Sequence, residues 1–553
     1  MTLALILLAS ISLAAQTLIT VSPAGDADGF ALEPLIKLRF DAPINPESLR
    51  NSVFIVWGAT RQRDGFTTYP DGYRMPINNL AWDPATNTAY AKPDEPLDHD
   101  RDYIIVYNTL EAARFHTRNV TQTILARRLG PTGSIQRSTA IDLAEIKSIQ
   151  TLSQTVADST KPLTDTGFPV DVSFLTQLGL RRLVFLNFES SRGDRVAVHA
   201  WLPNGPKPAA GWPVKLIGHG LFDNRFSGPT LFATAFIANS VVMSINAVGH
   251  GYGDASILRF EKIDGTKVDA PTNGRGRDIN SDGRIDPAEG CILPDFISTC
   301  LRETALDYQK LVREIQANID LDGDRQPDLN PNSIQYLGQS LGAMYGTILM
   351  AIEPGIDAAV LNVGGGSAIE TARTSTLLRP ILEQFVGKPN DPLIPRYAPA
   401  QRITTAQGQY LELLDRLSIS EAAGAPASFA PFLKQATLYG NPIKRVLFQY
   451  AKGDQSVPNN SNGQLIRAAF EYDLVSVYRH DIARQVVPTL PENPHAYMAA
   501  FAQLDQPSLL IALATLSQAS EFLASGRREV PDVNGLVRFL FRQNLFETPS
   551  LIP

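Results

Sequence analysis

The chain has 553 residues, of which 44% are hydrophobic and 19% are charged. This is the composition of a folded protein with room for roughly three or four domains, and it excludes a disordered tail, a collagen-like repeat and a coiled coil. The formal net charge of -7 provides no basic field for a phosphate backbone, so we expect no nucleic-acid partner.

The first 15 residues (MTLALILLASISLAA) form an apolar segment that is too short to span a bilayer comfortably and that ends in small residues. We interpret residues 1–15 as a signal peptide, which predicts a secreted or cell-envelope protein; a buried first strand or an uncleaved anchor is the alternative. The chain has two cysteines, Cys291 and Cys300. In an exported protein such a close pair is more typical of a disulfide than of a metal site, which needs further ligands.

Residues 18–117 predict a small all-β domain. Ile36, Leu38 and Phe40 alternate with basic residues, as in a strand with one buried face, and residues 103–107 (YIIVY) form a second strand-like run. Residues 22–49, with a Pro-Ala-Gly opening and a turn of sequence DAPINP, resemble the bacterial Ig-like domains that precede secreted enzymes. This resemblance implies an Ig-like fold for the domain.

Residues 118–171 predict a polar linker that contains one amphipathic helix packed on the next domain. The helix is indicated by apolar residues three or four positions apart along one face. These residues are Leu143, Ile146, Ile149, Leu152 and Val156.

Residues 172–553 predict an α/β domain with a mostly parallel sheet covered on both faces. Short apolar runs bounded by turn residues alternate here with helical segments, which is typical of this fold class. The expected strands are 183–188, 196–202, 214–217, 241–245, 334–337, 358–363, 445–450 and 474–478.

A helical cap over the carboxyl edge of the sheet is predicted for residues 367–442, which separate the sixth strand from the seventh. Such an insertion would lie over the carboxyl ends of the strands, where α/β folds bind their ligands, and its apolar residues could line a pocket. The apolar residues expected to line it are Leu377, Leu378, Ile381, Phe385 and Leu411.

The predicted nucleophile lies in residues 338–342 (GQSLG), which follow the fifth strand and precede a helix-compatible segment. In a sharp turn from a strand to a helix, glycines leave room for strained backbone, and the helix N-terminus directs free N–H groups toward an oxyanion. Because G-x-S-x-G also occurs by chance, the prediction of Ser340 depends on this context. A turn of small residues that merely closes a strand is the alternative.

An oxyanion loop is expected at residues 217–221 (IGHGL), where the third strand ends. The backbone N–H groups of Leu221 and Leu341 are the predicted oxyanion donors. We expect the His219 side chain to be structural, because such a loop acts through its backbone. His250, in the sequence GHG after the fourth strand, is interpreted in the same way.

The other two members of a catalytic triad are predicted downstream, in the order Ser, Asp, His. Residues 453–458 (GDQSVP) follow the seventh strand and supply Asp454, for which a plain Asx turn is the alternative. His495 lies in a long loop that could bring it to Ser340, whereas His480 ends the eighth strand. His495 is therefore the preferred base, with His480 left open.

Together, GHGL, a fourth strand ending in GHG, GQSLG, GDQSVP and a late histidine loop resemble the α/β-hydrolase lipase and esterase superfamily. With its Ig-like front, the chain is similar to secreted bacterial lipases of the virulence-factor, extracellular phospholipase type, from about Val172 to the C-terminus. The resemblance implies a serine ester hydrolase. The sequence departs from the pattern at Ala343, where a glycine is common, and after His495, where Gly or Phe is frequent; these departures concern the substrate rather than the reaction class.

A calcium loop is predicted at residues 278–289 (DINSDGRIDPAE). Such a loop uses side-chain oxygens at positions 1, 3, 5 and 9, a backbone carbonyl at position 7 and a bidentate glutamate at position 12. The corresponding residues are Asp278, Asn280, Asp282, Arg284, Asp286 and Glu289. We expect an isolated EF-like loop that holds structural Ca²⁺; an acidic turn without metal is the alternative.

A second acidic loop, residues 320–328 (DLDGDRQPD), repeats part of this spacing. Its candidate ligands are Asp320, Asp322, Asp324 and Asp328. Pro331 stands where the bidentate glutamate should be, so calcium binding by this loop stays open.

The predicted function is a secreted serine hydrolase that cleaves carboxylic esters, with a lipid or other hydrophobic acyl ester as substrate. Ser340 would attack the carbonyl, His495 would transfer the proton and Asp454 would orient His495. One alternative is a peptidase of the same fold, and another is a calcium-stabilised surface or adhesion protein without activity. The sequence leaves open the acyl chain length, the head group, the oligomeric state and peripheral contact with a membrane or cell surface.

Overall fold

The computed structural model describes residues 17–550 and 552, apart from the following: 24–32, 58–60, 64–65, 69–73, 78, 95–96, 98–100, 118–133, 168–169, 191, 234, 237–239, 293, 388–398, 435–437, 439–440 and 504. The predicted signal peptide, residues 1–15, lies outside the described residues. The chain divides into two compact units. The first comprises Met1–Arg118 and Pro389–Arg416, and the second comprises Asn119–Lys388 and Leu417–Pro553.

The first unit is built on two sheets that share one hydrophobic core. One sheet has the order β1-β2-β8-β7-β23 and the other the order β10-β9-β3-β6. In β2, the buried residues Ile36, Leu38 and Phe40 alternate with partly or fully exposed ones, as the sequence predicts. The strands are β1 (Leu18–Ser22), β2 (Ile36–Phe40), β3 (Val53–Trp57), β6 (Arg74–Pro76), β7 (Asn79–Asp83), β8 (Thr88–Lys92), β9 (Asp102–Tyr107), β10 (Leu110–His116) and β23 (Gln401–Arg402). The all-β character of this region is therefore confirmed.

Part of the expected cap belongs to the first unit, which corrects the prediction for residues 367–442. Strand β23 pairs in parallel with β7, and the first part of α10 (Thr405–Glu421) packs on the same sheet. The Lys37 ammonium group lies 2.7 Å from a Glu412 carboxylate oxygen. Leu411 is buried with Leu35 and Tyr90, so it serves the core of the first unit and not an acyl pocket.

The second unit contains a ten-stranded sheet in the order β11-β15-β16-β18-β17-β21-β22-β24-β25-β26. All neighbours from β18 to β25 are parallel, and the pairs toward both ends are antiparallel. The strands are β11 (Gln136–Asp142), β15 (Leu180–Glu189), β16 (Arg195–Pro203), β17 (Trp212–Gly218), β18 (Val241–Ile245), β21 (Leu329–Gln339), β22 (Ala358–Asn362), β24 (Arg445–Ala451), β25 (Val475–Tyr478) and β26 (Phe546–Glu547). All eight predicted strands are present, which confirms the α/β class.

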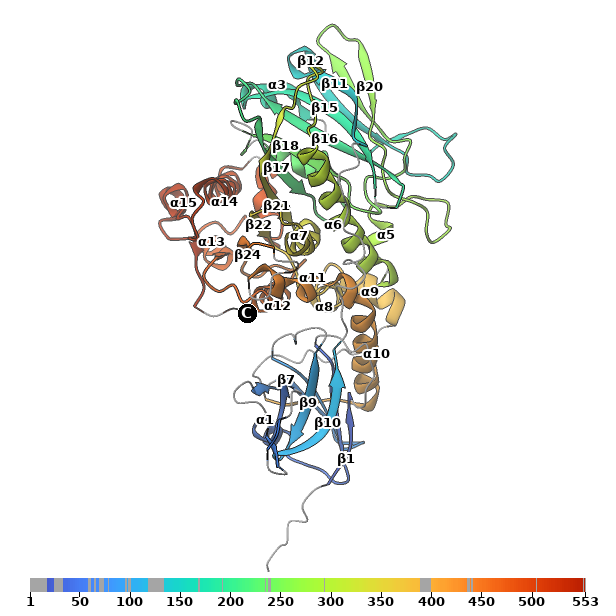
Figure 1. The fold of residues 1–553 in the computed structure, drawn as a ribbon, viewed down its shortest axis with the longest axis vertical. Helices are drawn as coiled ribbons and strands as arrows, with labels where there is room; N and C mark the ends of the chain where they lie inside the picture. Colours follow the sequence, from blue (N-terminus) through green and yellow to red (C-terminus); the bar gives the residue numbers. More distant parts are fainter. Residues whose placement is uncertain are drawn as a thin grey trace, which may run out of the picture. The chain divides into compact units, whose positions relative to one another are not determined.

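Both faces of this sheet are buried, because successive residues of a strand point to opposite faces. In β15, Val184 and Leu186 enter one core with α6 and α7, whereas Leu183 and Phe185 enter a second core with α14. Figure 1 shows α6 and α7 on one side of β21 and β22 and α14 and α15 on the other. The helices are α3 (Val172–Gln177), α4 (Ser227–Ala233), α5 (Glu289–Ile292), α6 (Pro294–Gln316), α7 (Leu341–Ile352), α8 (Ala368–Thr374), α9 (Arg379–Val386), α11 (Pro426–Phe429), α12 (Asn459–Ala468), α13 (His480–Val486), α14 (Gln506–Ser525) and α15 (Asn534–Phe541).

The predicted amphipathic helix in the linker is wrong, because its residues form strands. Residues 143–145 form a single 3-10 turn, and residues 146–153 form β12 (Ile146–Ser153), which pairs with β19 (Ile257–Lys262). The register shifts between Ile146 and Ser148, so an irregularity in the strand brings Ile146 and Ile149 to the same face. Three-residue spacing therefore arises here from a bulged strand. β12 and β19 lie in a separate sheet with β13 (Thr164–Asp165), β14 (Val170–Asp171) and β20 (Lys267–Pro271).

Among the described residues, one helix, α14, is long and apolar enough to cross a membrane. More than half of its most apolar window is buried inside the protein. Its residues Leu516 and Phe522 enter the core beneath the sheet, and Ile511 enters a neighbouring cluster. This burial is typical of a core helix.

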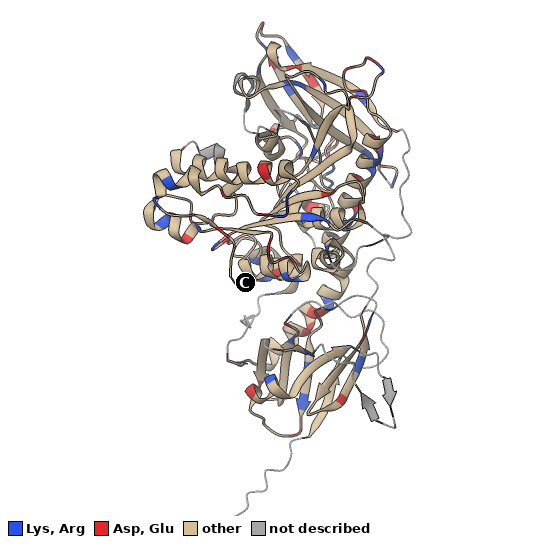
Figure 2. Ribbon diagram, turned by 60° about the vertical axis from the view of Figure 1, so that its left-hand side comes forward, with Lys and Arg blue, Asp and Glu red and all other residues tan. Residues whose placement is uncertain are grey.

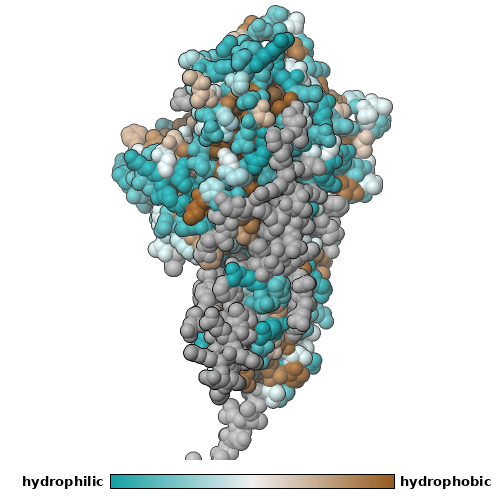
Figure 3. Space-filling model, in the orientation of Figure 1, coloured by the Kyte–Doolittle hydropathy of each residue, from teal (hydrophilic) through white to brown (hydrophobic). Residues whose placement is uncertain are grey.

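The surface of the described residues mixes the two signs of charge. Figure 2 shows basic and acidic residues interspersed along the ribbon. The face seen in Figure 3 is mainly hydrophilic over the upper strands, with hydrophobic residues scattered among them.

Candidate functional site

Ser340 lies in a strained turn between β21 and α7. Its φ of 56° and ψ of -117° are unusual for a residue with a Cβ atom. The turn is held because the Ser340 N–H donates to the Asn362 carbonyl at 2.8 Å, and the Ala343 N–H donates to the Ser340 carbonyl at 2.9 Å. A Cβ atom on Gly342 would lie 2.2 Å from the Gly218 carbonyl oxygen, so the last glycine of GQSLG permits this close packing.

The structure brings Ser340, His495 and Asp454 together in one hydrogen-bonded chain. Ser340 Oγ lies 2.8 Å from His495 Nε2, and His495 Nδ1 lies 2.8 Å from Asp454 Oδ2. The carboxylate accepts from Nδ1–H, which leaves Nε2 free to accept the serine proton. Asp454 is itself fixed, because its Oδ1 accepts from the Ser456 and Val457 N–H groups at 2.8 and 2.9 Å.

Asn493 connects the loops that carry the acid and the base, and the sequence analysis missed it. Its Oδ1 accepts from the Gln455 N–H at 3.1 Å and from the His495 N–H at 3.2 Å. Its Nδ2 donates to Ser456 Oγ at 2.9 Å. An asparagine two residues before a candidate histidine, in a loop rich in proline, was the available signal.

His480 has a different environment from His495. It is buried at the start of α13, its Nε2 lies 2.8 Å from the Pro491 carbonyl oxygen, and its Nδ1 lies 3.1 Å from the Tyr478 hydroxyl. Burial lowers the pKa of His480, and the bond to Pro491 opposes this effect. Both ring nitrogens are occupied by protein groups, so the structure leaves His480 outside the chain that ends at Ser340.

The expected oxyanion loop approaches Ser340 through its backbone. A Cβ atom on Gly220 would lie 3.4 Å from the Ser340 Cβ atom, which is van der Waals contact, so the loop packs directly against the serine. His219 fixes the loop: the Ala247 N–H donates to its Nε2 at 2.9 Å, and its Nδ1–H donates to the Gly220 carbonyl at 2.8 Å. Burial lowers the pKa of His219 and keeps the ring neutral. The structural role expected for this side chain is consistent with these contacts.

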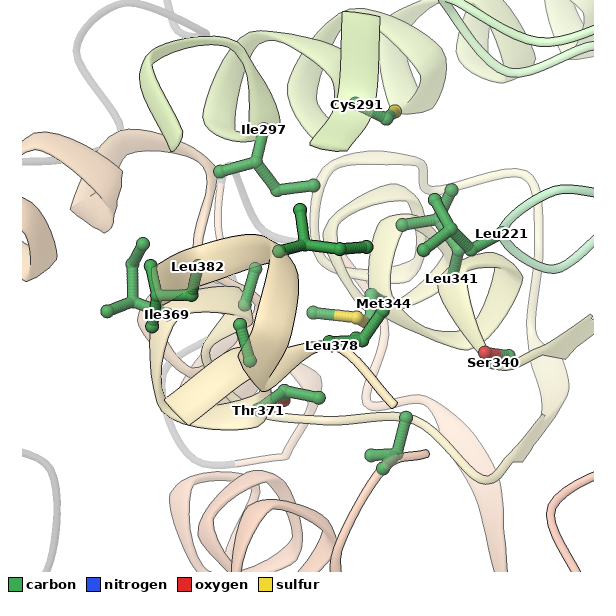
Figure 4. Close-up of a pocket in the computed structure, with 14 residues that line it drawn as sticks. Leu221, Cys291, Ile297, Ser340, Leu341, Met344, Ile369, Thr371, Leu378 and Leu382 are labelled. Atoms are coloured by element: carbon green, nitrogen blue, oxygen red, sulfur yellow. The ribbon is translucent and has the colours of Figure 1, made fainter. Parts of the chain in front are cut away.

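An apolar pocket opens beside Ser340. It has a volume of about 680 Å³ including its mouth. Figure 4 shows Ser340, Leu341 and Leu221 at one end and Ile369, Leu382 and Thr371 at the other, with Ile297 and Cys291 along a third side. The remaining lining residues are Met344, Ala368, Ala372, Leu378, Ile381 and Val457.

Two of the predicted pocket residues, Leu378 and Ile381, line this cavity. Leu377 is 54% exposed and is not among the lining residues. The side chain of Phe385 lies outside the described residues.

Helix α8 forms one wall of the pocket, and a buried carboxylate caps it. Glu421, only 2% exposed, accepts from Ser367 Oγ at 2.8 Å and from the Ala368 and Ile369 N–H groups. Burial raises the pKa of Glu421 to about 7, because desolvation outweighs these hydrogen bonds. The position of this wall therefore depends on an acid contributed from the end of α10.

The predicted disulfide between Cys291 and Cys300 is present, with the two Cα atoms 5.4 Å apart. It joins α5 to α6. His250 lies beside it: one nitrogen of His250 and the two Sγ atoms lie within 4.8 Å of one another. His250 Nδ1–H donates to the Val248 carbonyl at 3.0 Å, and burial lowers its pKa to about 4.

The first acidic loop folds around its own side-chain oxygens. Asp278 Oδ1 and Oδ2 accept from the Asp282 and Gly283 N–H groups at 3.1 and 2.9 Å. Asn280 Oδ1 accepts from the Asp282 N–H at 2.9 Å, and Asp282 Oδ1 accepts from the Arg284 N–H at 2.8 Å. Asp286 forms a long ion pair with Arg284, at 3.9 Å, between exposed side chains.

A lysine from another segment, Lys207, pairs with the second acidic loop. One oxygen from each of Asp320, Asp322 and Asp328 lies within 4.8 Å of the others. The Lys207 ammonium group lies 2.6 Å from Asp328 Oδ1 and 3.8 Å from Asp324 Oδ2. Lys207 thus supplies a positive charge at the place where a bound cation would otherwise be needed.

The similarity of this chain to known proteins is distant. No protein-family model matches the chain, and no curated protein matches its sequence. Among solved structures, acetyl xylan esterase 1 from Thermoanaerobacterium sp. JW/SL YS485 is 14% identical over 52% of this chain and 73% of that chain, with a TM-score of 0.32. An acetyl xylan esterase from Paenibacillus sp. R4 is 13% identical over 54% and 77%, with a TM-score of 0.36. A Pyrobaculum calidifontis esterase is 11% identical over 64% and 89%, with a TM-score of 0.33. At these values, conclusions about chemistry depend on this chain's own residues.

Proposed function

We propose that this protein is a serine hydrolase that cleaves carboxylic esters with an apolar acyl group. The observation that carries the proposal is the chain from Ser340 Oγ through His495 to Asp454, with 2.8 Å at each step, at one end of an apolar pocket. A nucleophile, a base and an orienting acid within hydrogen-bond distance are the parts that acyl transfer requires.

The reaction follows from the direction of these hydrogen bonds. His495 Nε2 takes the Ser340 proton while Oγ attacks the ester carbonyl carbon, and the N–H groups of Leu221 and Leu341 donate hydrogen bonds to the oxygen on which negative charge develops. The intermediate collapses to an acyl-serine as His495 gives the proton to the leaving alcohol. Water then attacks the acyl carbon while His495 takes one of its protons, and His495 gives that proton to Ser340 Oγ as the carboxylic acid leaves.

The pocket supports a preference for an acyl chain longer than acetyl. Its walls combine aliphatic side chains of α7, α8 and α9 with Leu221 and Ile297. Each buried methylene group of a substrate contributes about 0.8 kcal/mol of transfer free energy, which is roughly a fourfold gain in binding, so a medium chain should gain over acetate by about this factor for every methylene that it buries.

The test is a panel of p-nitrophenyl esters from acetate to palmitate, with peptide anilides as comparison substrates. We expect kcat/KM to rise with chain length to an optimum and anilides to be poor substrates. Ser340→Ala should lose on the order of a millionfold in turnover and all fluorophosphonate labelling, with unchanged Tm, while Ser520→Ala serves as a matched control. Preferred cleavage of anilides, or full activity of Ser340→Ala, would overturn the proposal.

We also propose that the protein is exported and that its first unit is an Ig-like domain. The Cys291–Cys300 disulfide supports export, because disulfides persist in oxidising compartments. Two packed sheets with one shared core support the Ig-like assignment. N-terminal sequencing of the secreted protein tests export: a mature chain that begins near residue 16 is the expected result.

A further inference from the structure

Glu289 occupies an unusual position in the first acidic loop. It begins α5 and is only 5% exposed. Its Oε1 accepts from the Ile279 and Asn280 N–H groups at 2.9 and 2.8 Å, which places the carboxylate inside the loop. Its Oε2 is buried and has no hydrogen-bond partner among the described residues. A buried carboxylate oxygen without a partner is unfavourable unless a cation accompanies it.

The loop therefore combines two independent signs of a cation site. Asp278, Asn280 and Asp282 gather on the same turn at positions 1, 3 and 5, and Glu289 closes it with a free oxygen at position 12. Oxygen ligands from carboxylates, an amide and a backbone carbonyl are those that Ca²⁺ prefers. Gly283, with φ of 84°, provides the turn expected at position 6.

The second acidic loop provides an internal comparison. Its Asp328 is also buried, but Oδ1 is paired with Lys207 and Oδ2 accepts from the Leu321 and Asp322 N–H groups. Its buried carboxylate, at position 9, is thus fully partnered by the protein. Among the described residues, no lysine pairs with the first loop. The ion pair found there joins the exposed side chains of Arg284 and Asp286. The comparison assigns the cation to residues 278–289.

Helix α5 links this loop to the acyl pocket. Glu289 begins the helix, and Cys291, two residues later, lines the pocket. The disulfide to Cys300 joins α5 to α6, which contributes Ile297 to the same wall. A shift of Glu289 by an ångström would therefore move two lining residues.

The same helix also contacts the segment that holds the oxyanion loop. A Cβ atom on Gly249 would lie 3.0 Å from the Gly290 Cα atom, so the two backbones pack directly. Cys291 Sγ lies 3.3 Å from the Val248 carbonyl oxygen. The neighbouring Ala247 N–H donates to His219, which holds the Gly220 carbonyl.

We propose that Ca²⁺ binds in the loop of residues 278–289 and, through α5, fixes both the wall of the acyl pocket and the oxyanion loop, so that calcium controls the use of long acyl chains. The second part of this proposal, the control of long acyl chains, rests on the proposed ester hydrolase activity. Removal of Ca²⁺ should leave the Ser340–His495–Asp454 chain in place, because, among the described residues, the hydrogen bonds that hold these three come from segments other than α5.

The first experiment measures binding without any substrate. CaCl₂ is titrated calorimetrically into the EDTA-treated full chain, and Tm is measured with CaCl₂, MgCl₂ or EDTA. We expect one Ca²⁺ per chain and a Tm that rises with calcium concentration, since a ligand of the folded state stabilises it. Glu289→Gln should raise Kd by about tenfold or more and reduce the shift in Tm, whereas Asp320→Asn in the second loop should change neither. Asp282→Asn serves as a second variant if Glu289→Gln does not fold. Absence of calcium binding, or equal losses in Glu289→Gln and Asp320→Asn, would overturn the site.

The second experiment measures the coupling. The ratio of kcat/KM for p-nitrophenyl decanoate to that for the acetate is compared with CaCl₂ and with EDTA, well below the lower Tm. We expect EDTA to reduce this ratio by about fivefold or more in the wild type and to have little further effect on Glu289→Gln. A constant ratio in a protein that binds calcium would refute the coupling. If no ester is hydrolysed, the proposed function fails, while the calorimetric result still decides the site.

Discussion

Replacing Asp454 by asparagine should remove nearly all ester turnover and leave the fold intact. Asp454 Oδ1 accepts from two backbone N–H groups, and Oδ2 faces His495 Nδ1. In Asp454→Asn, the carbonyl oxygen must keep the two N–H donors, so the NH₂ group must face His495. The histidine then presents Nδ1 as an acceptor and carries its proton on Nε2, where it can no longer accept the proton of Ser340.

A tautomer reversed in this way lowers kcat by about 10⁴ in serine hydrolases, which corresponds to about 5 kcal/mol of transition-state stabilisation. The assay is hydrolysis of a p-nitrophenyl ester, with Tm and circular dichroism to monitor folding. Asp505→Asn is a suitable control, since Asp505 also accepts from a backbone N–H, at the N-terminus of α14, where asparagine caps equally well. An Asp454→Asn protein that folds normally and keeps more than about a tenth of its activity would refute the assignment.

Further predictions concern positioning, the pocket, pH and the domain boundary. Asn493→Ala should lower kcat by about tenfold to a hundredfold with a small change in KM, because it frees the loops of Asp454 and His495; a change in KM alone would contradict this role. Ala372→Trp should reduce kcat/KM for decanoate at least tenfold and leave acetate nearly unchanged; equal losses for both esters would show that the chain binds elsewhere. Glu421 is protonated more readily in the folded than in the unfolded protein, so its contribution to stability is full below pH 4.5 and is lost as pH rises through about 7. The unfolding free energy of the wild type, measured relative to that of Glu421→Gln, should therefore fall by roughly 3 kcal/mol between these two pH values. A difference that does not change with pH would exclude the raised pKa of Glu421. A protein that begins at Val172 should fail to fold, because it loses four buried residues of the second core, which contribute roughly 6–12 kcal/mol in total: Ile141, Leu143, Ile146 and Ile149. A protein that begins at Ser134 keeps these residues and should fold. Soluble, folded protein from the shorter chain would contradict this expectation.

The catalytic chain was accessible from the sequence because each of its members lies in a short motif at the end of a strand. The strand before Ser340 and the strand before Asp454 are apolar runs bounded by turn residues, and parallel strands place their carboxyl ends at one edge. His495 had to be chosen from two histidines by loop length. The structure brings this one to Ser340, while the ring of His480 is occupied by Pro491 and Tyr478.

The contacts that position these groups were less accessible. Glu421 caps α8 from more than fifty residues away in the chain, and Asn493 reaches Ser456 across 37 positions. Neither residue belongs to a periodic pattern. Leu411 shows the same difficulty: its apolar character was recognised, but its partners Leu35 and Tyr90 lie in the N-terminal part of the first unit, far from it in the sequence. Sequence periodicity reports that a residue is buried and leaves its partner undetermined.

The arrangement separates the control of chemistry from the control of substrate choice. Ser340, Asp454 and His495 are held by backbone hydrogen bonds at the edge of the sheet, where the buried strands offer little freedom. Several helices in the walls of the acyl pocket are fixed near their ends by a few contacts: Glu421 holds α8, and Glu289 and the disulfide hold α5 and the start of α6. Variants of these wall devices should therefore act mainly on KM and on chain-length preference, whereas variants of the triad and of Asn493 should act mainly on kcat. If a wall variant and a triad variant reduced kcat for acetate equally, the two functions would share one structural origin, and this separation would be refuted.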